Sequence, residues 1–291
     1  MDSSSHRSTT AEGAAFCRAL GALARDASLR NPDHLAYHFV TRLGWRMGLW
    51  AALRWLARRQ LEQRVPGAYV LHQVRTRVFD DVLLTAIRDG TSQLVILGAG
   101  GDSRAYRFRS ELGGVTVFEV DHPATSTWKQ SCVRRMLGSP PDNVRYVPID
   151  FGCDALGPAL EKAHFDGGLR TLFLWEGVTM YLRPDAVDGV LSLVAGAPAG
   201  SSVVLDYVYV ESIAHPERFE GAVAQAKFTA SRGEPFLFGI GPEPDQVSAF
   251  LGARGLELAR HWDHQQLRAL YPGPGFLMPY LGIVHARVPT A

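Results

Sequence analysis

The first third of the chain carries apolar residues at helical spacing. Residues 14–30 predict one helix, which the turn-forming stretch at 31–34 ends. Residues 68–90 predict another, because valines recur at every fourth position and Gly90 supplies a C-terminal stop. Three helices are therefore expected before the first strand, since the segment between these two is also helical in pattern.

That middle segment, residues 43–61, is rich in tryptophan. Its apolar side chains lie on one face at helical spacing, namely Trp45, Leu49, Trp50, Leu53 and Leu56. Arginines interrupt the segment, so no window of about 18 uncharged apolar residues exists and no membrane span is expected. We expect this face to pack against the core; a helix lying on a membrane surface is the alternative.

From residue 93 onward, short apolar runs alternate with helical segments. The predicted strands are 93–98, 115–121, 143–150, 170–177 and 201–210, and helices over 123–137, 153–163 and 184–197 lie between them. This alternation predicts an α/β fold with a parallel sheet that helices cover on both faces. A helix at 244–255, a strand at 256–262 and a last strand within 275–288 complete the pattern.

These segments are expected to form one domain, because 291 residues with 46% hydrophobic content suffice for a single large core. Its predicted parts are a disordered polar tail at 1–13 and one domain at 14–291, divided into a helical lid at 14–66, a ligand-binding core at 67–208, a Gly/Pro-rich insertion covering the substrate at 209–245, and a C-terminal helix and strands at 246–291.

Charge and cysteine content narrow the possible partners and compartment. Lys and Arg total 30 against 29 for Asp and Glu, which gives no support for a nucleic-acid partner. Cys17, Cys132 and Cys153 form no metal-binding motif, so neither zinc nor a disulfide framework is expected. The N-terminus lacks the apolar region of a signal peptide, and a cytoplasmic location is predicted.

Glycines follow the first predicted strand, in the stretch from Gly98 through Ala99 and Gly100 to Gly101. Ligands of open α/β sheets bind at the carboxyl ends of strands, and glycine lets a ligand approach the main chain there. The spacing matches a dinucleotide fingerprint only in part, since Ser103 occupies its third glycine position. The alternative is a tight turn that binds nothing.

Carboxylates follow the next strands. Asp121 lies about twenty residues after Gly98, where nucleoside sites place the acid that binds a ribose, and Glu119 is a supporting or deeper paired charge. Asp150 could accept from an adenine amine, or could cap the following helix. Glu176 ends the fourth strand at the sheet centre, so a cationic or hydrogen-bonding partner is expected, and a ligand ammonium would serve.

Taken together, the stretches RTR (75–77), GAGGDSRAYRF (98–108), FEVDHP (118–123), PID (148–150) and LWEGVTMYL (174–182) resemble the leucine carboxyl methyltransferase family of S-adenosylmethionine (SAM)-dependent enzymes. They are especially similar to its bacterial branch of SAM-dependent or polyketide-carboxylate O-methyltransferases. The likeness covers roughly residues 65–208. It implies the class I methyltransferase fold, Rossmann-like, with seven strands of which the last is antiparallel.

The resemblance also implies roles for the site residues. Arg75, with Arg77 as the alternative, would pair with the methionine carboxylate of SAM, and Glu176 with its amine. The remaining expected cofactor contacts are Gly98, Ala99 and Gly100 at the methionyl part, Asp121 at the ribose, His122 flanking the adenosine, and Asp150 with the Phe151 amide at the adenine.

Methyl transfer from a sulfonium needs no metal, and a carboxylate acceptor is ionised at pH 7 without a base. The leading prediction is therefore O-methylation of a small-molecule carboxylate, in secondary metabolism. A hydroxyl, phenol or carbon acceptor is the alternative; a hydroxyl would need a base, for which His215 is the candidate, and Tyr181 could hydrogen-bond near the sulfonium or acceptor. Less favoured readings are a NAD(P)-dependent oxidoreductase and a non-catalytic SAM-binding protein.

Overall fold

The computed structural model describes residues 9–41, 51–151 and 154–290. Their strands form a single seven-stranded sheet in the order β3-β2-β1-β4-β5-β7-β6. The strands are β1 (Gln93–Leu97), β2 (Thr116–Asp121), β3 (Val144–Pro148), β4 (Thr171–Trp175), β5 (Ser202–Val208), β6 (Glu257–Trp262) and β7 (Leu281–Arg287). β1 to β5 pair in parallel, and β7 is antiparallel to both β5 and β6. The predicted sheet is confirmed, including its antiparallel last strand.

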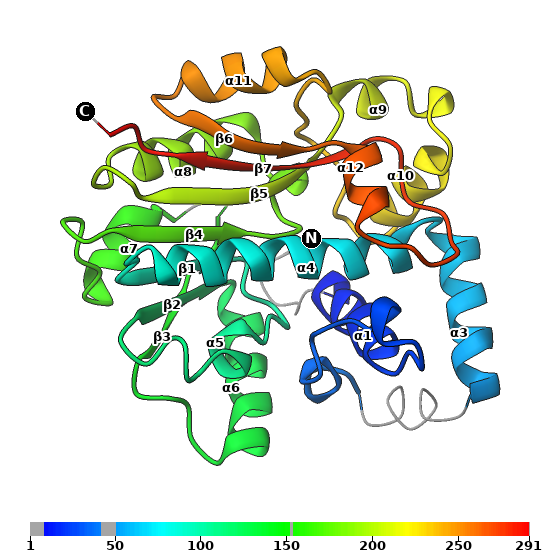
Figure 1. The fold of residues 1–291 in the computed structure, drawn as a ribbon, viewed down its shortest axis with the longest axis horizontal. Coiled ribbons are helices and arrows are strands. Elements are labelled where there is room, and N and C mark those ends of the chain that lie inside the picture. Colours follow the sequence, from blue (N-terminus) through cyan, green and yellow to red (C-terminus); the bar gives the residue numbers. More distant parts are fainter. Residues whose placement is uncertain (1–8, 42–50, 152–153, 291) are drawn as a thin grey trace.

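Helices flank this sheet and gather at its carboxyl end. They are α1 (Thr9–Ala22), α3 (Ala51–Arg64), α4 (Ala68–Arg88), α5 (Arg104–Arg107), α6 (Pro123–Leu137), α7 (Leu156–Lys162), α8 (Pro184–Ala195), α9 (Val210–Ala214), α10 (Ala222–Ala230), α11 (Pro244–Gly252) and α12 (His264–Ala269). Short 3-10 turns lie at Ala27–Leu29, Ala36–Phe39, Thr179–Tyr181 and Pro216–Arg218. In Figure 1, α4 runs along the sheet, while α1, α3, α9 and α10 lie toward the end where β4 and β5 point.

The core consists of the strands themselves and the faces that the helices turn toward them. Every residue of β1, β4 and β5 is buried, as expected for central parallel strands covered on both sides. No helix among the described residues is both long enough and apolar enough to cross a bilayer.

The face of the tryptophan helix was predicted wrongly where it can be checked. Leu53 is 36% exposed and Leu56 43%, whereas Ala57 and Leu61 pack against the core instead. Trp45, Leu49 and Trp50 lie outside the described residues. Apolar spacing indicated a helix, but the packed face of α3 is set by the neighbouring α4 and α10 and not by its largest side chains.

Two predicted boundaries also change. Helix α1 begins at Thr9, inside the predicted tail, because Ala11 packs beside the glycine turn and its next turns are buried. The Gly/Pro-rich insertion at 209–245 contains α9 and α10, and most of its Gly and Pro residues follow α10. Residues of this insertion line the cavity described below, but closure over a substrate stays a prediction.

Candidate functional site

A cavity of about 620 Å³ lies at the carboxyl ends of β1, β2 and β4. Helix α1 and the insertion supply further parts of its wall. The predicted residues that line it are Arg75, Gly98, Ala99, Gly100, Asp121, His122, Asp150, Phe151, Glu176 and Tyr181. The parallel sheet and α4 thus bring together residues as far apart as Arg75 and Tyr181, since the strands end at the same edge.

The glycine turn after β1 is shaped by close packing. Gly98 has φ +66° and Gly100 φ +36°, and a Cβ on Gly98 would lie 2.3 Å from Val178 Cγ2. No side chain fits at Gly98 without a shift of Val178. Gly98, Ala99, Gly100 and Gly101 all line the cavity.

Asp121 holds this turn from the neighbouring strand. Its carboxylate accepts from the backbone N–H of Gly100 at 2.5 Å and from that of His122 at 2.6 Å. Burial raises the pKa of Asp121, and the two N–H donors oppose that rise. Each carboxylate oxygen keeps a further lone pair, so Asp121 can still accept from a ligand hydroxyl.

Glu119 is the deeper paired charge of the two acids on β2. It lies 2.8 Å from Lys129 Nζ and accepts from the Tyr106 hydroxyl, also at 2.8 Å. Lys129 in turn donates to the carbonyl oxygen of Ala99 at 3.0 Å. The sequence analysis missed this buried lysine of α6, whose hydrogen bond to Ala99 holds the glycine turn in place.

Arg75 and Glu176 form the charged centre of the cavity. Arg75 Nε is 3.0 Å from Glu176 Oε1, and Arg75 Nη1 donates to Asp206 Oδ2 at 2.7 Å. Asp206 is fully buried in β5 and also accepts from the Gly177 N–H. The predicted cationic partner of Glu176 is thus an arginine of the same chain. Asp206 was missed, although an acid inside an apolar strand was a usable signal.

A second arginine reaches Glu176 from α5. Arg104 Nη1 lies 2.7 Å from Glu176 Oε2, and Arg104 also pairs with Asp102 and Asp80. Burial alone would raise the pKa of Glu176, but Arg104 and then Arg75 outweigh it and hold the pKa at about 2. Glu176 is therefore ionised at neutral pH.

The pairing of Arg75 with Glu176 leaves hydrogen-bonding capacity unused. Arg75 Nε and Glu176 Oε2 are buried, and within the described part of the chain neither has a hydrogen bond of acceptable angle despite its short ion-pair distance. Arg75 and Glu176 nevertheless both line the cavity, and a guanidinium and a carboxylate are the groups that pair with the carboxylate and ammonium of an amino-acid group.

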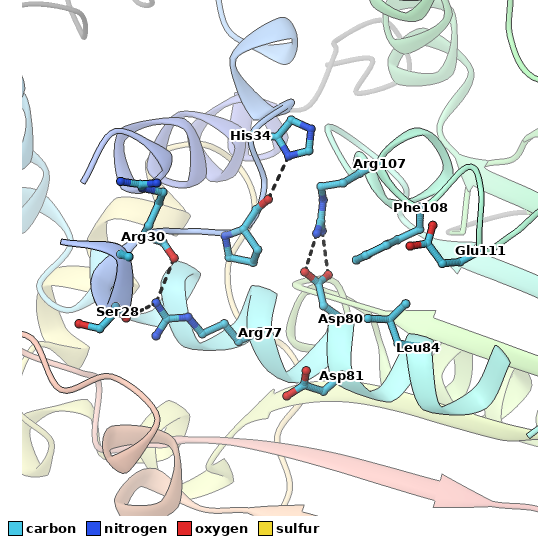
Figure 2. A pocket seen from close by; sticks show the side chains of 12 residues that line it. Ser28, Arg30, His34, Arg77, Asp80, Asp81, Leu84, Arg107, Phe108 and Glu111 are labelled. Carbon is cyan, nitrogen blue, oxygen red and sulfur yellow. Dashed lines mark hydrogen bonds and ion pairs between the residues drawn. The ribbon is translucent and has the colours of Figure 1, made fainter. Parts of the chain in front are cut away.

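Arg77 points elsewhere, because residues two apart on a helix do not face the same side. It donates to the carbonyl oxygens of Ser28 at 2.6 Å, Arg30 at 3.0 Å and Leu270 at 3.0 Å. Figure 2 shows it beside a second pocket, of about 630 Å³, where Arg107 pairs with Asp80. The structure places Arg75 in the first cavity and Arg77 outside it.

Arg18 of helix α1 joins that helix to the glycine turn and to Asp33. Arg18 donates to the carbonyl oxygen of Gly101 at 2.7 Å and to Asp33 at 2.9 Å. Ser103 Oγ donates to the other oxygen of Asp33 at 2.5 Å. These contacts join the N-terminal helical segment to the core, and no local sequence signal indicated them.

Two imidazoles line the cavity, and both use Nδ1 as an acceptor. His122 Nδ1 accepts from the Ala124 N–H at 3.3 Å, and His72 Nδ1 lies 3.1 Å from Arg75 Nη2, which can only donate. Burial, then the charge of Arg75, lowers the pKa of His72 well below its usual value. Because Nδ1 of each ring accepts a hydrogen bond, Nε2 is the ring nitrogen left to donate.

His215 lies apart from the cavity. It follows α9 on an exposed turn, with its side chain 49% exposed and 3.6 Å from Glu217. This position does not fit the base expected for a hydroxyl acceptor. Tyr181 does line the cavity, where burial raises the pKa of its hydroxyl, so the phenol stays protonated at neutral pH.

The rest of the cavity wall is largely apolar. It is formed by α3, the turn after β4, the insertion and the approach to β7, with Leu61, Val65, Met180, Phe228, Phe236, Met278 and Leu281 as its main side chains. This apolar half, which also carries Arg232 and Glu234 of the insertion, and the charged half around Arg75 and Glu176 belong to one cavity.

Bacterial proteins of one name are among the relatives of this chain. A protein of Mycobacterium sp. (strain JLS), named "Putative S-adenosyl-L-methionine-dependent methyltransferase", is 35% identical over 191 residues, covering 62% of this chain and 60% of that protein. One of the same name from Mycobacterium tuberculosis (strain ATCC 25177 / H37Ra) is 34% identical over 214 residues, covering 72% and 68%. The chain thus spans about 60% of the length of the first of these relatives.

Solved structures share the fold. A DUF574 family protein from Streptomyces avermitilis MA-4680 matches 98% of both chains with a TM-score of 0.59 at 16% identity. A structure from Thermobifida fusca YX, titled a "putative methyltransferase", matches 83% of this chain and 90% of its own with a TM-score of 0.53 at 18% identity. The fold is that of the class I methyltransferases. A family model described as leucine carboxyl methyltransferase matches residues 11–195, and the chain belongs to that family.

Proposed function

We propose that this chain is a SAM-dependent O-methyltransferase that converts a small-molecule carboxylate into its methyl ester. Arg75 and Glu176 would hold the amino-acid end of SAM, and the turn from Gly98 through Ala99 to Gly100 its methionyl part. The adenosine end would contact Asp121, His122, Asp150 and Phe151. Bound SAM would supply an electrophilic methyl group on a sulfonium.

The hydrogen bonds of the two imidazoles favour a carboxylate over a hydroxyl as the methyl acceptor. His72 and His122 present N–H donors at Nε2, and the hydroxyl of Tyr181 is kept protonated by burial. A carboxylate needs no proton removed before it attacks, so alignment and exclusion of water suffice. A hydroxyl or phenol acceptor would need a base.

The apolar half of the cavity would serve the acceptor. Phe228, Phe236 and Met278 can exclude water from an acid's hydrocarbon body while its carboxylate faces the charged half. The cytoplasmic location and the place in secondary metabolism stay predictions.

The nature of the product tests this function. The protein is incubated with methyl-labelled SAM and a panel of small carboxylic acids, and products are treated with mild alkali. A methyl ester releases labelled methanol, whereas a methyl ether or a C-methyl product does not. An alkali-stable labelled product would show that the acceptor is not a carboxylate. Absence of labelled product from every acid would contradict the proposal, provided that the chain is folded.

A further inference from the structure

Asp80 is a buried acid of α4 that takes no part in the contacts proposed so far. It lines the second pocket together with Arg107 and lies outside the wall of the first cavity. Only 5% of its surface is exposed. A buried carboxylate destabilises the folded chain unless cations and donors pair with it, so its partners indicate what it does.

Both carboxylate oxygens of Asp80 are engaged by arginines. Arg107 donates from Nη1 to Oδ2 at 2.7 Å and from Nη2 to Oδ1 at 2.8 Å, a two-pronged contact that Figure 2 shows. Arg104 donates from Nε to Oδ1 at 2.8 Å. All three side chains are less than a tenth exposed. The carboxylate is therefore fixed in position, and it fixes the guanidinium that donates to it through Nε.

The planar guanidinium of Arg104 transmits this constraint to Glu176. Once Nε donates to Asp80, the direction of Nη1 follows from the rigid geometry of the group. Arg104 Nη1 lies 2.7 Å from Glu176 Oε2, and the other oxygen of Glu176, Oε1, lies 3.0 Å from Arg75 Nε. Glu176 is thus held between two arginines, one of which is oriented by Asp80.

Asp80 differs from Asp102, the other acid that pairs with Arg104. Asp102 lies 2.5 Å from Nη1, but it is two positions before Arg104 in the same turn and also accepts its backbone N–H. Asp80 belongs to α4, the helix that also carries Arg75. The Asp80 contact therefore ties the orientation of Arg104 to the helix that provides the other partner of Glu176.

We infer that Asp80 is a positioning residue for the cofactor: it orients Arg104, which holds Glu176 where the cofactor ammonium binds. Asp80 itself touches no part of the cofactor. The inference rests on the proposed role of Glu176. If Asp80 only joined α4 to α5, its loss would lower stability, and its effect on cofactor affinity would not depend on Glu176.

A double-mutant cycle on the binding of S-adenosylhomocysteine (SAH) separates these roles. Isothermal titration calorimetry gives the affinity of the wild type, Asp80→Asn, Glu176→Gln and the double variant. We expect Asp80→Asn to weaken binding roughly tenfold, the low end for a charge-assisted hydrogen bond. In the Glu176→Gln background the same substitution should change affinity by less than about twofold, because the carboxylate on which Asp80 acts is gone. Wild-type affinity in Asp80→Asn, or losses that multiply in the double variant, would overturn the inference.

A second ligand shows whether the effect is confined to the amino-acid end. 5′-Methylthioadenosine has the adenosine and the sulfur of SAH but lacks its amino acid. Asp80→Asn should bind this compound as the wild type does. An equal loss for both ligands would mean that Asp80 maintains the cavity as a whole, which would contradict a positioning role.

The controls concern charge and folding. Asp81→Asn removes an exposed carboxylate from the next position of α4 and should bind SAH as the wild type does. If Asp80→Asn folds poorly, Asp80→Asn/Arg107→Gln removes the pair together and leaves Arg104 with Asp102 and Glu176. That variant should show the same loss of SAH affinity, and wild-type affinity in it would overturn the inference. Wild-type affinity in Glu176→Gln would instead remove the proposed cofactor contact, and this inference with it.

Discussion

Two arginines two positions apart, Arg75 and Arg77, differ completely in surroundings. Arg75 pairs with Glu176 and Asp206 at the cavity. Arg77 lies outside the cavity and donates hydrogen bonds to backbone carbonyl oxygens. The sequence motif contained both and could not separate them. The separation follows from the helical turn between them and from which face of α4 meets the sheet.

Binding measurements should separate the two arginines. We expect Glu176→Gln and Arg75→Gln each to weaken SAH binding by at least ~1.5 kcal/mol, roughly tenfold, because each removes a charge-assisted hydrogen bond to the amino-acid end. Isothermal titration calorimetry gives the affinities. Arg77→Gln is the control and should bind SAH as the wild type does. Wild-type affinity in both cavity variants would remove the proposed contact with the methionine group.

At the scale of elements, the β1–α5 turn shows why glycine is needed where the sequence has it. Its main chain approaches Val178 from the turn after β4 and Ala11 from α1 at once. The glycine cluster therefore reflects packing between three segments as well as access to a ligand. Sequence spacing located the turn but could not show these neighbours.

Gly98→Ala should destabilise the protein by about 1–3 kcal/mol, because the new Cβ meets Val178 and the positive φ strains an alanine. Chemical denaturation measures the change, and SAH affinity should fall with it. The double variant Gly98→Ala/Val178→Ala should regain only the stability lost to the clash with Val178, because the strain of the positive φ remains.

Gly114→Ala is the matched control for this glycine, since a Cβ there meets nothing within 4 Å. Its stability should stay within about 0.5 kcal/mol of the wild type. An equal loss at both glycines would show that the close approach of Val178 is not the cause.

For the whole molecule, stability should depend on pH through a histidine in the sheet. His285 lies in β7 with a buried Nε2 that has no hydrogen-bond partner in the described part of the chain. Burial, then the charge of Arg287, lowers its pKa from 6.5 to about 4. The unfolded chain therefore takes up a proton at a higher pH than the folded chain does.

Acid should accordingly favour unfolding between about pH 6.5 and pH 4, where only the unfolded imidazole is protonated. The contribution of His285 to this loss is about 3 kcal/mol over that window. Urea denaturation of the wild type and of His285→Leu across the window measures it, and the variant should lose less stability. Parallel pH profiles for the two proteins would show that His285 keeps its ordinary pKa when folded.

The sequence alone determined the alternation of strands and helices, the glycine turn and the acids at the strand ends. Those features are local, because periodicity and strand-end residues can be read within a few positions, and parallel strands must end at one edge. Only the tertiary structure decided that Arg75 and not Arg77 enters the cavity, that Asp206 and Lys129 support it, that α3 exposes Leu53 and Leu56, and that Asp80 pairs with Arg104 and Arg107. Each of these depends on which distant segments come into contact, and the spacing of residues along the sequence does not specify those contacts.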